Sequence, residues 1–296
     1  MMKRLKGIGL LLIANVLIFV ALSVVFNLLV HLILPAFGID LRGAVSQQDL
    51  VWALVIGFGG AFLSLAFSKQ MARAMLECYE ITQPRTHEEH VIYGAVQEIA
   101  QRLRITMPEV WVYEAPDPNA FATGPSKNNS MVAVSTGLLN NLDQQEVRAV
   151  LAHEMGHVYN GDMFTTTVLA GLMNTFVYFI SIWVRRIFAE REQPMLGFML
   201  SMLLQIVLGI LAMIPIMWFS RRREFAADAF SARMYGRDAM ISALRAIERW
   251  VTRAQPEYST QDPLVTFKIS GQTAGFAHLF ASHPPIEERV AALQRL

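Results

Sequence analysis

Four long stretches without Asp, Glu, Lys or Arg constrain this chain more than any other feature of its sequence. A helix that crosses a membrane needs about 20 predominantly apolar residues, and each stretch is long enough. Only 17% of the residues are charged, against about 25% in a typical soluble domain. The residues outside the four stretches are also too few to enclose four buried apolar helices. We therefore expect four transmembrane helices, at about residues 8–34, 50–68, 163–184 and 194–220.

Basic residues beside these stretches predict how the chain is oriented. Residues 3–6 contain three basic side chains, whereas only Arg42 lies in the short loop after the first stretch. Because Lys and Arg concentrate on the cytoplasmic side, we expect a multi-pass protein with both termini in the cytoplasm. Residues 221–223, which are all Arg, agree with this orientation. The loop at 185–193 also carries three arginines, which is unusual for a loop on the outer side of the membrane. A second hairpin that does not fully cross the membrane is therefore kept as an alternative.

A metal-binding motif follows the second apolar stretch. His153, Glu154 and His157 form a His-Glu-x-x-His pattern, and residues four apart lie on the same face of a helix. The two imidazoles can therefore bind one Zn²⁺ ion, with Glu154 as general base.

Signals at both ends of this segment favour a helix. Asp143 and Glu146 have the spacing of a capping box, and Gly161 is suited to end the helix. We therefore prefer a catalytic zinc helix to a buried helix that carries two histidines by chance.

A catalytic zinc ion usually takes three protein ligands and keeps one position open for water. Glu224 is the candidate third ligand, and Asp228, four residues later, would face the same way and accept a hydrogen bond from His153. On spacing alone, the two carboxylates could equally pair with the arginines that precede them.

These motifs together resemble the HtpX family of membrane zinc endopeptidases. The His-Glu-x-x-His motif is followed, across two apolar segments, by Arg-Arg-Glu224-Phe-Ala-Ala-Asp228. The anchor arrangement at the N-terminus matches as well, so the resemblance covers essentially the whole chain. Three shorter segments also match, at residues 119–124, 135–139 and 282–286.

The resemblance implies a role for several residues. It implies that Glu224 is the third zinc ligand and that Asp228 orients a ligand histidine. His283 and Arg289 are implied to stabilise the oxyanion of the tetrahedral intermediate, although a helix-entry residue and a solvated helix face would also fit them. The resemblance also implies an edge strand that binds extended substrate by strand addition, formed by Asn119, Ala120, Phe121 and Ala122. The residues alone favour an ordinary hairpin at this place.

The resemblance also implies what the protein does. We expect a zinc endopeptidase with one Zn²⁺ per chain, in the bacterial inner (cytoplasmic) membrane, with its active site on the cytoplasmic side. Its polypeptide substrates would be misfolded or damaged membrane proteins, cleaved during quality control and stress response. The net charge of +1 gives no case for binding nucleic acid, and the single Cys78 excludes an internal disulfide. The sequence does not predict an oligomeric state.

Three other functions deserve comparison. A CAAX-type prenyl-protein endopeptidase shares the His-Glu-x-x-His motif and the later Glu, but that family has more membrane helices. A non-catalytic scaffold with structural zinc would need a fourth protein ligand, and no cysteine lies near the motif. An intramembrane protease is disfavoured because the motif lies in a charged, capped segment before the third apolar stretch.

The expected fold is that of a mainly α membrane protein, with four transmembrane helices and a zincin-like α+β cytoplasmic protease domain. In the soluble parts, helical patterns occur near 85–104, 238–251 and 286–296, and strand patterns near 109–113 and 130–134. We expect a first membrane hairpin, a first protease segment with the motif helix, a second membrane hairpin and a second protease segment with the third ligand, at residues 1–68, 69–162, 163–220 and 221–296.

Overall fold

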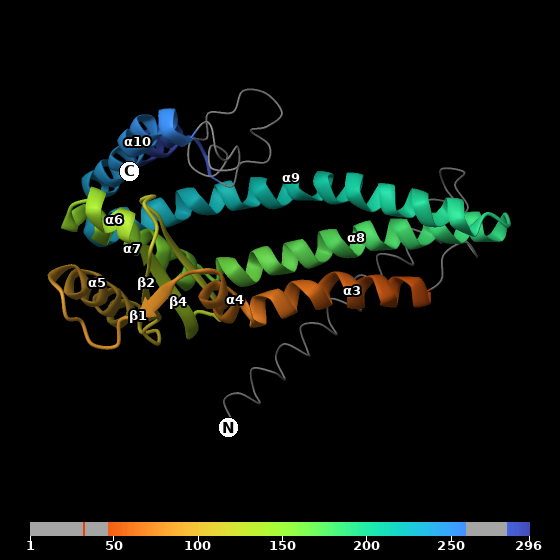
Figure 1. Ribbon diagram of the computed structural model, residues 1–296, viewed down its shortest axis with the longest axis horizontal. Helices are drawn as coiled ribbons and strands as arrows, with labels where there is room; N and C mark the ends of the chain where they lie inside the picture. The colour runs from red at the N-terminus through yellow and green to blue at the C-terminus, as the bar shows by residue number, and fades with distance from the viewer. Residues whose placement is uncertain (1–31, 33–46, 259–282) are drawn as a thin grey trace, which may run out of the picture. The chain divides into compact units, whose positions relative to one another are not determined.

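The computed structural model describes residue 32 and residues 47–258 and 283–296 (Figure 1). The first expected transmembrane helix, at about 8–34, lies almost wholly outside the described residues. Among those residues, three helices are long and apolar enough to cross a membrane. The chain divides into two compact units, one made of residues 1–60 and 170–212 and the other of 61–169 and 213–296.

The first unit contains parts of three long helices, α3 (Gln47–Ala66), α8 (Asp162–Glu190) and α9 (Pro194–Tyr235). Helices α3 and α8 lie in close contact, because a Cβ atom added at Gly57 would come within 2.5 Å of the backbone nitrogen of Thr175. Small residues allow this kind of approach between membrane helices. On α9, large apolar side chains such as Met195 and Met199 are 72% and 62% exposed. An apolar surface of this extent fits contact with lipid.

Helix α9 does not end where its apolar stretch ends, near residue 220. It continues to Tyr235 without interruption (Figure 1). The residues that follow the apolar stretch are mainly Arg and Ala, which both favour helix, and Gly236 comes directly after the last helical residue. Glu224 and Asp228 therefore lie on a regular helix rather than on a loop beyond it.

The second unit contains a four-stranded sheet in the order β1-β2-β4-β3. Strands β2 and β4 are parallel, and the two outer pairs are antiparallel. The predicted strands at 109–113 and 130–134 correspond to β2 and β4, whereas β1 was not predicted. Strand β3 lies at one edge of the sheet. The strands are β1 (Cys78–Glu80), β2 (Glu109–Tyr113), β3 (Ala120–Ser126) and β4 (Asn129–Ser135).

Six further helices of this unit lie within the described residues, and α7 is the central one. It packs against α5, α10 and β3, and its side chains Leu151, Ala152 and Met155 are fully buried in the core. These helices are α4 (Ser68–Met75), α5 (His87–Leu103), α6 (Thr136–Asn141), α7 (Gln144–Asn160), α10 (Arg237–Tyr258) and α12 (Ile286–Gln294).

The ends of α7 follow the predicted signals. The Asp143 side chain accepts a hydrogen bond from the Glu146 backbone N–H, and the Glu146 side chain accepts one from the Asp143 N–H. This is a complete capping box. At the other end, Gly161 has φ 70° and ψ 32°, a left-handed conformation that glycine adopts without a steric penalty. The helix that carries the motif therefore has a fixed start and a fixed stop.

Candidate metal centre

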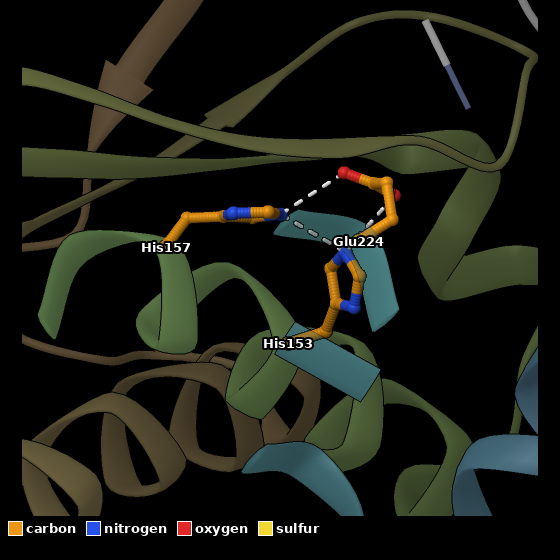
Figure 2. Close-up of side chains that lie close together, drawn as sticks. All are labelled: His153, His157 and Glu224. Atoms are coloured by element: carbon orange, nitrogen blue, oxygen red, sulfur yellow. Dashed lines mark hydrogen bonds and ion pairs between the residues drawn. The ribbon is translucent and has the colours of Figure 1, made fainter. Parts of the chain in front are cut away.

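Three side chains converge on one point in the second unit. His153 and His157 lie one turn apart on α7, and Glu224 comes from α9. Figure 2 shows the two imidazoles and the carboxylate pointing toward one another. The two Nε2 atoms are 3.2 Å apart. The Glu224 oxygens lie 3.2 Å from Nε2 of His157 and 3.5 Å from Nε2 of His153.

These distances fit a tetrahedral zinc site. Zinc binds histidine nitrogen and carboxylate oxygen at about 2.0–2.2 Å, so neighbouring ligand atoms of a tetrahedral ion are about 3.3–3.5 Å apart. The separation of the two Nε2 atoms is close to this value, and each imidazole has one Glu224 oxygen at a similar distance, Oε1 for His157 and Oε2 for His153. Two imidazoles with one carboxylate also form the donor set of a catalytic site that leaves its fourth position open.

His153 is held from behind by a buried carboxylate. Its Nδ1–H donates to Oδ1 of Asp228 at 2.8 Å. A carboxylate can only accept hydrogen bonds, so the proton must lie on Nδ1 and the Nε2 lone pair faces the ligand position. Asp228 in turn accepts two hydrogen bonds from Arg289, one from Nε at 2.8 Å and one from Nη2 at 2.6 Å. Asp228 and Arg289 therefore fix the orientation of this imidazole.

His157 has an equivalent support that the sequence did not reveal. Its Nδ1–H donates to Oδ2 of Asp162 at 2.8 Å, and Asp162 forms an ion pair with Arg223. Asp162 is 6% exposed and begins α8 directly after the turn at Gly161. The sequence did carry a signal for this contact, because an Asp directly after a helix stop lies close to the last turn of that helix. A search for side chains four residues apart misses Asp162, which comes five residues after His157.

The carboxylates around the two histidines favour positive charge at the site. Burial opposes protonation of His153, but its hydrogen bonds to Asp228 and Glu224 outweigh this effect and raise its pKa. Burial likewise opposes protonation of His157, and the bonds to Asp162 and Glu224 raise its pKa to about 10. A site that attracts protons in this way will also attract a divalent cation, which must displace them.

A cavity beside the His153 imidazole brings together most of the remaining candidate residues. Glu154 is half-buried and lines this cavity with His153. Asn119 and Ala120 of the β3 edge line it too, whereas Phe121 and Ala122 lie further along the strand and do not. The apolar wall of the cavity is formed by Leu138, Val150, Met240, Leu244, Ile247 and Ile286.

His283 and Arg289 also line the cavity. The half-exposed His283 lies 2.6 Å from Glu224, between Nδ1 and Oε2. Arg289 is only 8% exposed, so the solvated-face alternative for this residue is wrong. Both of the hydrogen bonds described above direct its guanidinium at Asp228, and its Nη1 is 3.5 Å from Glu224.

Comparison with known proteins gives consistent results. The sequence model of peptidase family M48 matches residues 86–296. A protease HtpX homolog of Methylacidiphilum infernorum is 43% identical over 302 residues, which cover 98% of this chain and 99% of that one. Protease HtpX of Pasteurella multocida is 43% identical over 286 residues, covering 95% and 98% of the two chains. A protease HtpX homolog of Nitrosomonas europaea is 45% identical over 304 residues, covering 99% of each.

One solved structure shares the fold. The crystal structure of S. mikatae Ste24p has a TM-score of 0.61, with 18% sequence identity, over 95% of this chain and 67% of that chain. At this identity, the likeness concerns the fold alone.

Proposed function

The chain belongs to peptidase family M48 and, within it, to the HtpX membrane metalloproteases, and we propose that it is a zinc endopeptidase acting on the cytoplasmic side of the bacterial inner membrane. The observation that carries this proposal is the convergence of His153, His157 and Glu224 beside a cavity lined by Glu154. A scaffold without activity is set aside, because the family is one of metallopeptidases.

In this proposal His153, His157 and Glu224 hold the zinc ion. Zinc bound there supplies Lewis-acid polarisation of the scissile carbonyl and lowers the pKa of the attacking water to about 7. Glu154 takes the proton from that water and then delivers it to the leaving amine. Asp228 and Asp162 keep both imidazoles in the tautomer that presents Nε2.

The substrate binds in extended form beside β3. Ser135 donates its backbone N–H to the carbonyl of Asn119 at 2.9 Å, so the polar backbone groups of Asn119 face β4. Because these groups alternate along an antiparallel strand, those of Ala120 and Ala122 face away from β4. Backbone bonds to these two residues would hold a polypeptide without strict demands on its sequence.

The carbonyl oxygen that becomes negatively charged needs a hydrogen-bond donor. His283 is the better candidate, because its half-exposed side chain lines the cavity next to Glu224. Arg289 is committed to Asp228 by two hydrogen bonds, so its main role in this proposal is to position Asp228 and His153.

The substrate class rests on membrane anchoring and on strand addition. A membrane-anchored enzyme that recognises extended backbone suits misfolded or damaged membrane proteins, and their removal would place the protein in quality control and stress response. The fold likeness to Ste24p carries no substrate class to this chain.

Metal content tests the proposal most directly. We would measure zinc by mass spectrometry on the detergent-purified wild type and on Glu154→Gln, Glu224→Ala and, as a surface control, Glu88→Ala. Cleavage of an unfolded reporter polypeptide would be measured on the same samples. The expected result is about one zinc per chain in all but Glu224→Ala, with cleavage abolished in Glu154→Gln and retained in Glu88→Ala. Zinc retained in Glu224→Ala, or near wild-type cleavage by Glu154→Gln, would refute the corresponding role.

A further inference from the structure

Helix α4 contacts the sheet of the second unit through its charged residues. Lys69 Nζ lies 2.8 Å from Oε1 of Glu109, at the start of β2, and 2.8 Å from Oδ1 of Asn129. Arg73 also pairs with Glu109, and its guanidinium lies 4.7 Å from the centre of the Trp111 ring. Both cations of α4 are therefore used in contacts with the sheet.

The opposite face of α4 is apolar and exposed. Phe67, Met71 and Met75 are 54%, 48% and 79% exposed, and their spacing of four residues places them in one line along the helix. Ala74 lies between them, and Gln70 is the one exposed polar residue beside this line. We call Phe67, Met71, Ala74 and Met75 the outer face of α4.

This arrangement is the reverse of that on a helix at a water-exposed surface. There, the apolar residues pack on the core and the charged residues face solvent. In α4, all of whose residues are described, the charges face the protein and the methionines face outward. The outer face therefore needs an apolar environment outside the unit.

The chain itself indicates which environment this is. Helix α3, which is long and apolar enough to span a membrane, ends at Ala66, one residue before Phe67. Helical hydrogen bonding continues across the junction, from the Phe67 N–H to the Leu63 carbonyl at 3.0 Å and from the Met71 N–H to the Phe67 carbonyl at 2.9 Å. Leu63, which is 60% exposed, lies one turn before Phe67, so the outer face continues the apolar surface of the span.

We propose that α4 is an interfacial helix whose outer face lies in the boundary between lipid headgroups and acyl chains. At 1.5 Å per residue, Met75 is at most about 14 Å from the end of α3, so the helix cannot leave the vicinity of the membrane. Amphipathic helices of this kind bury their apolar face about 5–10 Å into the boundary. The backbone of Phe67, with φ −99° and ψ 8°, departs from α-helical geometry, so the chain has a point at which α4 can turn toward the membrane plane.

The consequence concerns the β3 edge. Helix α4 packs against β3, and its Lys69 binds the first residues of β2 and β4, Glu109 and Asn129. A lipid-bound outer face therefore ties the sheet to the membrane surface. A segment that emerges from the bilayer would meet the proposed substrate edge close to its point of exit.

The test is fluorescence quenching on the full chain. Single cysteines would be introduced by Met71→Cys, Met75→Cys or, as the control, Asp238→Cys, whose side chain is 91% exposed. Each variant would carry Cys78→Ser to remove the native thiol and Glu154→Gln to prevent self-cleavage. A bimane label would then be attached in vesicles of phosphatidylethanolamine and phosphatidylglycerol. Retained zinc would serve as the check that each labelled protein is folded.

The two quenchers distinguish the outcomes. Lipids with brominated acyl chains should reduce emission from the labels at 71 and 75 about twofold, because an interfacial label lies within reach of the chains, while aqueous iodide should quench only the label at 238. Iodide quenching at 71 and 75 equal to that at 238 would overturn the proposal. Resistance to both quenchers, together with energy transfer between copies of the chain, would overturn it in favour of a second copy covering this face. A failure of the proposed protease activity would leave the quenching result unchanged.

Discussion

His157 donates a hydrogen bond from Nδ1 to Oδ2 of Asp162 across the left-handed turn at Gly161. This contact is the counterpart of the bond from His153 to Asp228. Each carboxylate is also paired with an arginine, Arg223 for Asp162 and Arg289 for Asp228. Each of the two histidines is thus held by an Asp–Arg pair, and the pair behind His153 joins α9 to α12.

Removing Asp162 should weaken metal binding without removing a ligand. Loss of a carboxylate behind a ligand histidine typically lowers metal affinity about 10–100-fold. We therefore expect Asp162→Ala to lower zinc affinity by about this factor, and to cleave substrate again when zinc is supplied in excess. Competition with a fluorescent chelator would measure the affinity. Asp238→Ala, at an exposed aspartate, is the matched control, and equal affinities for the two variants would contradict the role of Asp162.

Replacing Arg289 should affect stability as well as catalysis. Arg289→Gln would leave the buried Asp228 carboxylate without its cation, and breaking a buried pair in this way costs about 3–5 kcal/mol. We expect a lower melting temperature and weaker zinc binding, with Arg295→Gln at the exposed end of the chain as the control. Arg289→Lys should recover only part of the loss, because an ammonium group keeps the charge but lacks the planar pair of donors that meets both carboxylate oxygens. A fall in kcat with unchanged stability and zinc affinity would instead indicate a direct oxyanion contact.

Metal removal should lower the melting temperature of the second unit, which holds the metal site. A ligand that binds only the folded state stabilises it by roughly 3–4 kcal/mol when its free concentration is about 100–1,000 times Kd. A chelator should therefore shift the thermal transition of Glu154→Gln downward, and zinc should restore it. Glu224→Ala should melt at the same temperature with and without chelator. A chelator-dependent shift in that variant would mean that other residues hold the metal.

Local patterns predicted the parts of this structure that are decided locally. The capping box at Asp143 and Glu146 and the stop at Gly161 depend on backbone groups within one turn, so the limits of α7 could be read from the sequence. Asp162 carried a local signal, its place directly after the helix stop, which the search for pairs four residues apart did not use. The burial of Arg289 could not be read, because it depends on how α12 packs against α10, far away in the sequence. The outward apolar face of α4 was also missed, since a hydrophobic pattern gives the two faces of a helix but not which one faces the protein.

Proline substitutions in β3 test whether its outer edge binds substrate. At Ala122 the backbone N–H faces away from β4, whereas the Phe121 N–H faces β4, given that Asn119 pairs with Ser135. Ala122→Pro should therefore fold normally, because proline is tolerated where an edge strand has no ladder partner. It should nevertheless lower kcat/KM, by about tenfold if one backbone hydrogen bond of about 1.4 kcal/mol is lost.

Phe121→Pro, by contrast, should destabilise the fold. It removes a bond within the β3–β4 ladder and a ring that lies 5.8 Å from that of Tyr113, so we expect a lower melting temperature together with lost activity. Thermal unfolding and cleavage of an unfolded polypeptide, measured on both variants, separate the two effects. If Ala122→Pro kept full kcat/KM while Phe121→Pro was unstable, β3 would be a structural edge strand, and the substrate would have to bind elsewhere around the cavity beside Glu154.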